Sequence, residues 1–167
     1  AASDVYKRQI LFSIYRDFLF LISHPKSLRK DLLIMKVEER LLKYVGYHTT
    51  SDEASDKIPS SDREFALARE LESELKELGL SKVVLTDHCY VYGLLPATAG
   101  MEHKKAVGFI AHMDTAPDFS GENVKPQQLR HYDGSDVLLR GSGEYLRVSD
   151  FPELKALSGR TLITTDG

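Results

Sequence analysis

The chain has 167 residues, 42% of them hydrophobic, which is enough for one domain with a sizeable core. Its net charge of −3 gives no strongly basic surface and argues against nucleic acid as a partner. Cys89 is the only cysteine, so an intrachain disulfide is excluded, which fits a reducing cytoplasm.

The first 34 residues contain the most hydrophobic stretch of the chain, Ile10–Ile22. This stretch is shorter than the roughly 20 apolar residues of a membrane-spanning helix, and Arg16 and Asp17 interrupt it. No small-residue cleavage site of a secretory signal follows it. We therefore predict no membrane association. We interpret residues 1–34 as an extension outside the fold, with a targeting segment as the alternative, and residues 35–167 as the domain.

Two helices are predicted next. Apolar residues at 37, 41, 42 and 45 have helical spacing, and Gly46 ends this first helix. A polar loop over residues 48–60 leads to Ser61–Glu64, which has the Ser-x-x-Glu pattern of a capping box. Apolar residues at spacings of three and four then run to Gly79, a left-handed stop. The charged face of this helix is predicted to be solvated, and consists of Arg69, Glu70, Glu72, Glu74, Lys76 and Glu77.

The elements predicted after the second helix are strands. Two Val-rich or apolar runs with a short connection indicate a hairpin, and a near-continuous apolar run follows it. The predicted strands are 82–86, 89–95, 106–112 and 161–165, with short strands at 136–140 and 144–148 in an otherwise irregular region over residues 113–159. A helix before this β region favours the α/β class, with a mixed sheet flanked by helices.

The motif that carries chemistry is His-x-Asp at the end of the predicted strand 106–112. Alternate residues of a strand share a face, so His112 and Asp114 are expected to point the same way. A metal-binding imidazole usually donates its second ring N–H to a carboxylate, which fixes the tautomer. The motif could therefore supply both parts, with His112 as a metal ligand and Asp114 as the carboxylate behind it. A strand that simply leaves the core into a polar turn is the alternative.

Other polar residues are predicted to have no such role. Asp87 and His88 are neighbours, which in a strand point to opposite faces, and Cys89 is expected to be a small buried hydrophobic residue. The remaining histidines lie in the extension, in turns or in the long loop: His24, His48, His103 and His131. Solvation also accounts for the acidic loop residues Asp118, Glu122, Asp133 and Asp136.

The segment around this motif resembles the first metal motif of peptidase T, a family of two-zinc tripeptide aminopeptidases. The resemblance runs in order from Met35 to Gly167 and is carried by separated blocks. These blocks are Met35–Val45, Thr49–Asp52 with Pro59–Ser61, Ala111–Asp118, Gly121–Pro126 and Leu157–Gly167. Asp166 belongs to the last block and is not matched to a metal ligand.

The resemblance implies part of a zinc-aminopeptidase-like catalytic domain. His112 would bind one of two zinc ions, Asp114 would have a catalytic role as the orienting carboxylate, and the substrates would be small peptides, namely tripeptides. The family's second metal motif, its general base and its other ligands match no position here, so we expect this chain to be inactive alone. The resemblance also implies a cytoplasmic protein and allows a homodimer of the complete protein.

Two alternatives remain open at the level of sequence. Related two-zinc enzymes include dipeptidases, carboxypeptidases and amidohydrolases, which His-x-Asp does not distinguish. The second alternative is a non-catalytic α/β fragment, since a catalytic zinc needs about three protein ligands and the sequence offers one.

Overall fold

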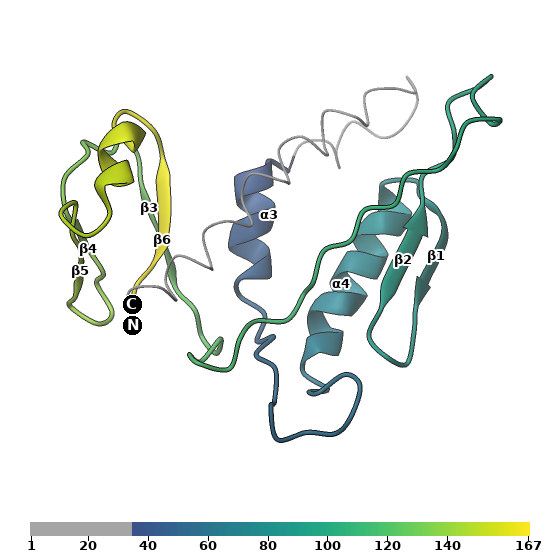
Figure 1. Cartoon of the computed structure of the whole chain (residues 1–167), viewed down its shortest axis with the longest axis horizontal. Coiled ribbons are helices and arrows are strands. Elements are labelled where there is room, and N and C mark those ends of the chain that lie inside the picture. Colours follow the sequence, from purple (N-terminus) through teal and green to yellow (C-terminus); the bar gives the residue numbers. More distant parts are fainter. Residues whose placement is uncertain (1–34) are drawn as a thin grey trace. The chain divides into compact units, whose positions relative to one another are not determined.

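The computed structural model describes residues 35–167, which contain two α-helices, six strands and one 3₁₀ helix (Figure 1). The combination of helices and strands predicted from the sequence is confirmed, but the described strands form three two-stranded antiparallel sheets and not the single mixed sheet that was predicted. The described residues fall into two compact units: the first holds residues 35–41 and Ala68–Ala111, and the second holds Leu42–Leu67 and His112–Gly167. The prediction for residues 1–34 lies outside the described part of the chain.

Both predicted helices are present. Helix α3 covers Val37–Tyr44 and α4 covers Glu64–Glu77, so each lies within the range that periodicity indicated. The backbone N–H of Gly79, at φ 82, bonds the carbonyl of Lys76, which agrees with the predicted left-handed stop. Hydrogen bonds at the start of α4 differ from the predicted capping box, because the Glu64 carboxylate accepts from the Ser60 hydroxyl at 3.4 Å.

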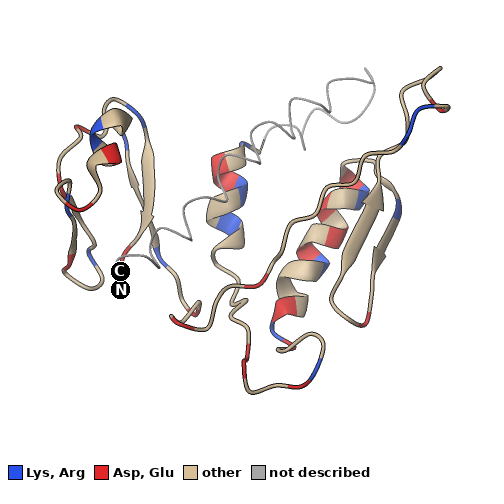
Figure 2. Ribbon diagram, in the orientation of Figure 1, with Lys and Arg blue, Asp and Glu red and all other residues tan. Residues whose placement is uncertain are grey.

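One member of the predicted charged face of α4 is not solvated. Figure 2 shows acidic and basic residues interspersed along α4, as the sequence pattern indicates. Glu74, however, is only 6% exposed, and its Oε2 accepts a hydrogen bond from Arg40 Nη1 of α3 at 3.0 Å. The prediction for Glu74 was wrong because a basic partner distant in sequence makes burial of this carboxylate possible.

The predicted hairpin is confirmed and lies beside α4 (Figure 1). Strand β1, Ser81–Leu85, pairs antiparallel with β2, Val91–Leu94, and the register shifts between Ser81 and Val84. Gly93 allows the close approach to the helix, since a Cβ there would lie 2.9 Å from Leu80 Cδ2 and 3.4 Å from Leu75 Cδ1.

The predicted strand 106–112 is not a strand. Residues 105–114 run without regular structure, and the apolar side chains from Ala106 to Ala111 are exposed. Val107 is 76% exposed, Phe109 64% and Ile110 fully exposed. An apolar run becomes a strand only where another strand pairs with it, and no such partner lies beside it in the described residues.

The second unit has its own core. Strand β3, Pro126–Leu129, pairs antiparallel with β6, Leu162–Thr165, and β4, Val137–Leu138, pairs antiparallel with β5, Tyr145–Leu146. The 3₁₀ helix η2, Pro152–Leu157, follows β5. Sequence reasoning anticipated β4, β5 and β6 but not β3 or η2. The buried residues of this core are Tyr132, Val137, Leu139, Leu146 and Leu154.

Among residues 35–167, no helix combines the length and the apolar character that a membrane span requires.

Candidate metal centre

A parallel bridge in the second unit holds the end of the His-x-Asp motif. The backbone N–H of Thr115 donates to the Thr49 carbonyl at 2.9 Å, and that of Ser51 donates to the Thr115 carbonyl at 3.0 Å. The residues after the motif are therefore fixed by the loop that follows α3. No sequence pattern indicates this pairing, because 65 positions separate Thr50 from Thr115.

His112 and Asp114 make the contact that the motif predicted. Asp114 Oδ1 lies 3.0 Å from His112 Nδ1, and the Asp114 backbone carbonyl lies 2.9 Å from the same nitrogen. A carbonyl oxygen can only accept, so Nδ1 must carry the proton. In the neutral ring, Nε2 is then the nitrogen with a lone pair for a metal ion. The His112 side chain is 66% exposed, which leaves it accessible to a ligand.

The other oxygen of the same carboxylate has a partner of its own. Ser51 Oγ donates to Asp114 Oδ2 at 2.7 Å. Burial raises the pKa of Asp114, but the hydrogen bonds from Ser51 and His112 outweigh it, and the net pKa lies below the usual value. Asp114 is thus held as an anion that accepts from both sides.

Two buried threonines that precede Ser51 support this arrangement. Thr49 is 4% exposed and Thr50 8%. Thr50 Oγ1 accepts a hydrogen bond from the backbone N–H of Gly121 at 2.8 Å. A Cβ on Gly121 would lie 2.6 Å from Thr50 Oγ1 and 3.2 Å from Thr115 Oγ1, so only glycine fits there without displacement. The Thr49–Ser51 segment is therefore tied to both the motif and the loop after it.

A second carboxylate lies within electrostatic range of the motif. Glu64, at the start of α4, is 8% exposed. Its burial raises the pKa, and the negative charge of Asp114 raises it further, while the hydrogen bond from Ser60 acts in the opposite direction. Sequence reasoning placed Glu64 only in a capping box. No residue pattern along the chain relates it to Asp114, because the two residues are 50 positions apart.

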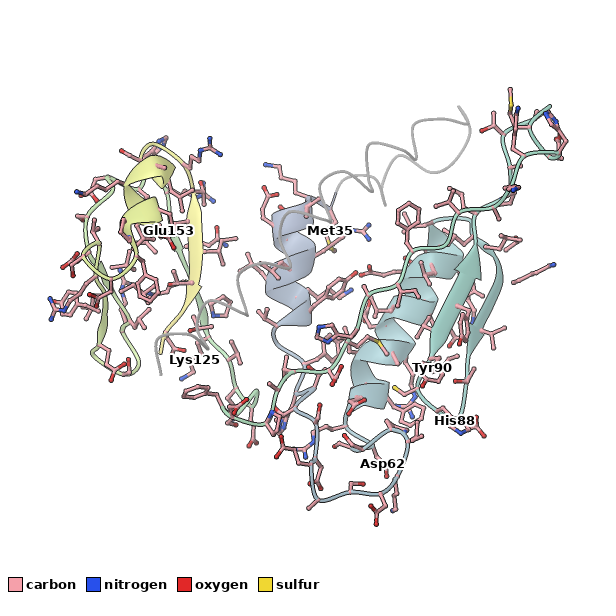
Figure 3. The ribbon with its side chains drawn as sticks, in the orientation of Figure 1. Met35, Asp62, His88, Tyr90, Lys125 and Glu153 are labelled. Atoms are coloured by element: carbon pink, nitrogen blue, oxygen red, sulfur yellow. The ribbon has the colours of Figure 1, made fainter. Side chains whose placement is uncertain are left out.

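The other histidines are placed elsewhere. His48 Nε2 lies 3.0 Å from Arg63 Nη1. Asp87 and His88 do form a pair, at 2.7 Å between Oδ1 and Nδ1, because they lie in the turn of the hairpin and not within a strand. This corrects the expectation that they point apart. Figure 3 shows His88 and Tyr90 at this turn, where their rings stack.

The cysteine is buried, as predicted, and two of the four acidic loop residues accept backbone hydrogen bonds. Cys89 is 3% exposed. Asp133 accepts hydrogen bonds from the backbone N–H and the hydroxyl of Ser135, which lower its pKa. Asp136 Oδ1 accepts from the backbone N–H of Val148 at 2.8 Å. These contacts shape turns within the second unit.

The donor set of the motif suits a metal ion in part. An imidazole with a defined Nδ1–H tautomer and a carboxylate behind it is the usual arrangement of a metal-binding histidine. Residues 35–167 contain no group of three or more His, Cys, Asp or Glu side chains that could hold a metal ion. The described residues therefore supply one candidate ligand, His112, and its supporting carboxylate.

Comparisons with curated proteins give consistent relatives. The chain is 54% identical over 133 residues to a protein named peptidase T from Caldanaerobacter subterraneus, covering 79% of this chain and 32% of that protein. Peptidase T of Clostridium acetobutylicum is 50% identical over 133 residues, with the same coverage. Peptidase T of Aliivibrio fischeri is 50% identical over 138 residues, covering 83% of this chain and 32% of that protein. No protein-family model matches the chain. The chain thus spans about a third of the length of the curated relatives it matches.

Proposed function

We infer from this likeness that the chain belongs to the peptidase T family, and on that premise we propose that the whole protein is a zinc-dependent aminopeptidase. Its substrates would be tripeptides, from which it releases the amino-terminal residue. The identity of 47–54% among the first relatives supports this proposal. The observation from the structure that supports it most is the hydrogen bond between His112 Nδ1 and Asp114 Oδ1 at 3.0 Å.

The residues of this chain would contribute binding and orientation. His112 would hold a zinc ion through Nε2, and Asp114 would keep the ring in the Nδ1–H tautomer and add negative charge behind it. A bound zinc ion would polarise the scissile carbonyl and lower the pKa of water for the attack. The threonines at 49 and 50 would keep the motif in place, because their backbone and hydroxyl groups fix it on one side.

The cytoplasm is the proposed site of action. Cys89 is the only cysteine in the sequence, so no intrachain disulfide can form, which fits a reducing compartment. Small peptides are the partners that this activity requires, and the charge of the chain supplies no basic surface for nucleic acid.

Hydrolysis by the complete protein tests the proposal. We expect it to release the amino-terminal residue of a tripeptide, to lose this activity with a chelator and to regain it with added zinc. A tripeptide with an acetylated amino terminus is the matched control and should not be cleaved, because an aminopeptidase recognises the free amine. Release of the carboxyl-terminal residue would instead identify a carboxypeptidase, and hydrolysis that resists the chelator would contradict a metal-dependent mechanism.

A further inference from the structure

The Asp114 carboxylate is held by two different side chains, one on each oxygen. Oδ1 accepts from His112 Nδ1 at 3.0 Å, and Oδ2 accepts from the Ser51 hydroxyl at 2.7 Å. A carboxylate with one partner can rotate about its Cβ–Cγ bond, whereas two partners on opposite oxygens fix the plane of the group. The orientation that Asp114 presents to His112 thus depends on Ser51.

The Ser51 proton has two acceptors within reach, and one is preferred. Besides Asp114 Oδ2 at 2.7 Å, the Thr115 carbonyl lies 3.2 Å from Ser51 Oγ. A hydroxyl has a single proton to donate, and the shorter bond to a charged acceptor is the stronger one. The hydroxyl therefore donates to the carboxylate.

Ser51 is itself fixed by its backbone. Its N–H donates to the Thr115 carbonyl at 3.0 Å, and the preceding residue, Thr50, is buried and accepts the Gly121 N–H. Ser51 therefore reaches Asp114 from a rigid segment 63 residues away in sequence. A rigid support is what a group needs if it is to hold another side chain within a fraction of an ångström of its working position.

We propose that Ser51 is a positioning residue of the metal centre, which acts through Asp114 to orient the His112 imidazole for the metal ion. This inference rests on the proposed function, since it concerns the same site. Ser51 makes no bond to the substrate. It holds Asp114, which in turn holds the His112 ring. Neither the motif nor its spacing points to Ser51.

A double-mutant cycle on zinc affinity tests the proposal. In the complete protein, zinc affinity is measured by competition with a chromogenic chelator for Ser51→Ala, Asp114→Ala and the pair. Loss of an outer hydrogen-bond partner typically weakens metal affinity by about 10–100-fold. We expect Ser51→Ala to weaken zinc binding about tenfold when Asp114 is present and to have no further effect when Asp114 is alanine, because the hydroxyl then has nothing to position.

Three further variants separate the hydroxyl from the shape of the side chain. Ser51→Thr keeps the hydroxyl and should retain zinc affinity, whereas Ser51→Val, which has the shape of threonine without the hydroxyl, should behave like Ser51→Ala. Ser55→Ala is the matched control, because the Ser55 hydroxyl lies in the same loop and accepts from the Lys57 backbone N–H at 3.3 Å. This variant should retain zinc affinity.

The possible outcomes distinguish this inference from the proposed function. An equal loss in both backgrounds would show a general structural role for Ser51 and overturn the proposal. Weaker zinc binding by His112→Ala together with unchanged zinc binding by Ser51→Ala would also overturn the role of Ser51. This second result would still support the metal site. Unchanged zinc affinity in both His112→Ala and Ser51→Ala would overturn the metal site and the role of Ser51 together.

Discussion

The protonated nitrogen of one imidazole determines what the His-x-Asp motif can do. Two acceptors belonging to Asp114, its side chain and its carbonyl, lie within 3.0 Å of His112 Nδ1. The tautomer is therefore set before any ligand arrives, and Nε2 is available without a proton having to be removed from it. A pre-organised ring of this kind loses less entropy when it binds a ligand.

Replacement of His112 tests the role of the ring directly. In the complete protein, His112→Ala should lower tripeptide hydrolysis by orders of magnitude, because it removes a metal ligand, and zinc content measured by elemental analysis should fall. His131→Ala is the matched control: His131 lies in a loop of the same unit, and its loss should change the activity little. An unimpaired His112→Ala enzyme would contradict the proposed metal site.

Replacement of Asp114 should have a milder effect. Asp114→Ala removes the carboxylate but leaves the Asp114 carbonyl to accept from His112 Nδ1. We expect zinc affinity or activity to fall by about 10–100-fold, which is the usual cost of losing such a partner. Chelator competition and steady-state kinetics measure the two quantities. A loss as large as that of His112→Ala would show that Asp114 does more than orient the ring.

At the scale of the elements, a buried ion pair joins the two helices. The Arg40 and Glu74 side chains are 9% and 8% exposed, and 3.0 Å separates their charged atoms. Removing one partner leaves the other charge buried, so Glu74→Ala should lower the free energy of unfolding by about 3–5 kcal/mol. Urea denaturation of the chain measures this change.

A surface pair on the same helix provides the control for this experiment. Glu72 accepts from Lys76 at 2.7 Å, but the lysine side chain is 56% exposed. Glu72→Ala should change the free energy of unfolding by no more than about 0.5 kcal/mol, as exposed i, i+4 pairs do. Equal effects of the two substitutions would contradict a special role for the buried pair.

Local patterns predicted the helices, and they failed where structure depends on distant partners. Helical spacing identified α3 and α4 because the apolar residues of each helix and the glycine that ends it lie within one short segment. Residues 106–112 look like a strand from their side chains alone, yet strand formation needs a neighbour. Strand β3, whose sequence is Pro-Gln-Gln-Leu, has no alternation of apolar and polar residues, so its pairing with β6 could not be read from it.

The candidate site shows the same limit. Strand alternation predicted the contact between His112 and Asp114, and the contact is present although residues 105–114 form no strand. Ser51 and Glu64 lie in other segments, and only the folded chain brings them near Asp114. Sequence reasoning identifies the candidate ligand His112 and its partner Asp114, but not the groups that hold Asp114.

At the scale of the whole molecule, the present chain should not catalyse the reaction alone. A catalytic zinc needs about three protein ligands, and the described residues contain no group of three candidate ligands. The purified 167-residue chain with added zinc should therefore release no amino acid from tripeptides. Measurable release that a chelator abolishes would show that the ligand set is complete within this chain.

The exposed segment from Ala106 to Ala111 also affects how copies of the chain behave together. Six uncharged residues without proline, whose large side chains are open to solvent and which belong to none of the described sheets, resemble the segments that stack into intermolecular β-structure. Lys104 and Lys105 precede this segment and Asp114 follows it closely. Charges at both ends act as gatekeepers, since stacking copies in register would bring like charges together. We therefore expect the Asp114 carboxylate to act against aggregation as well.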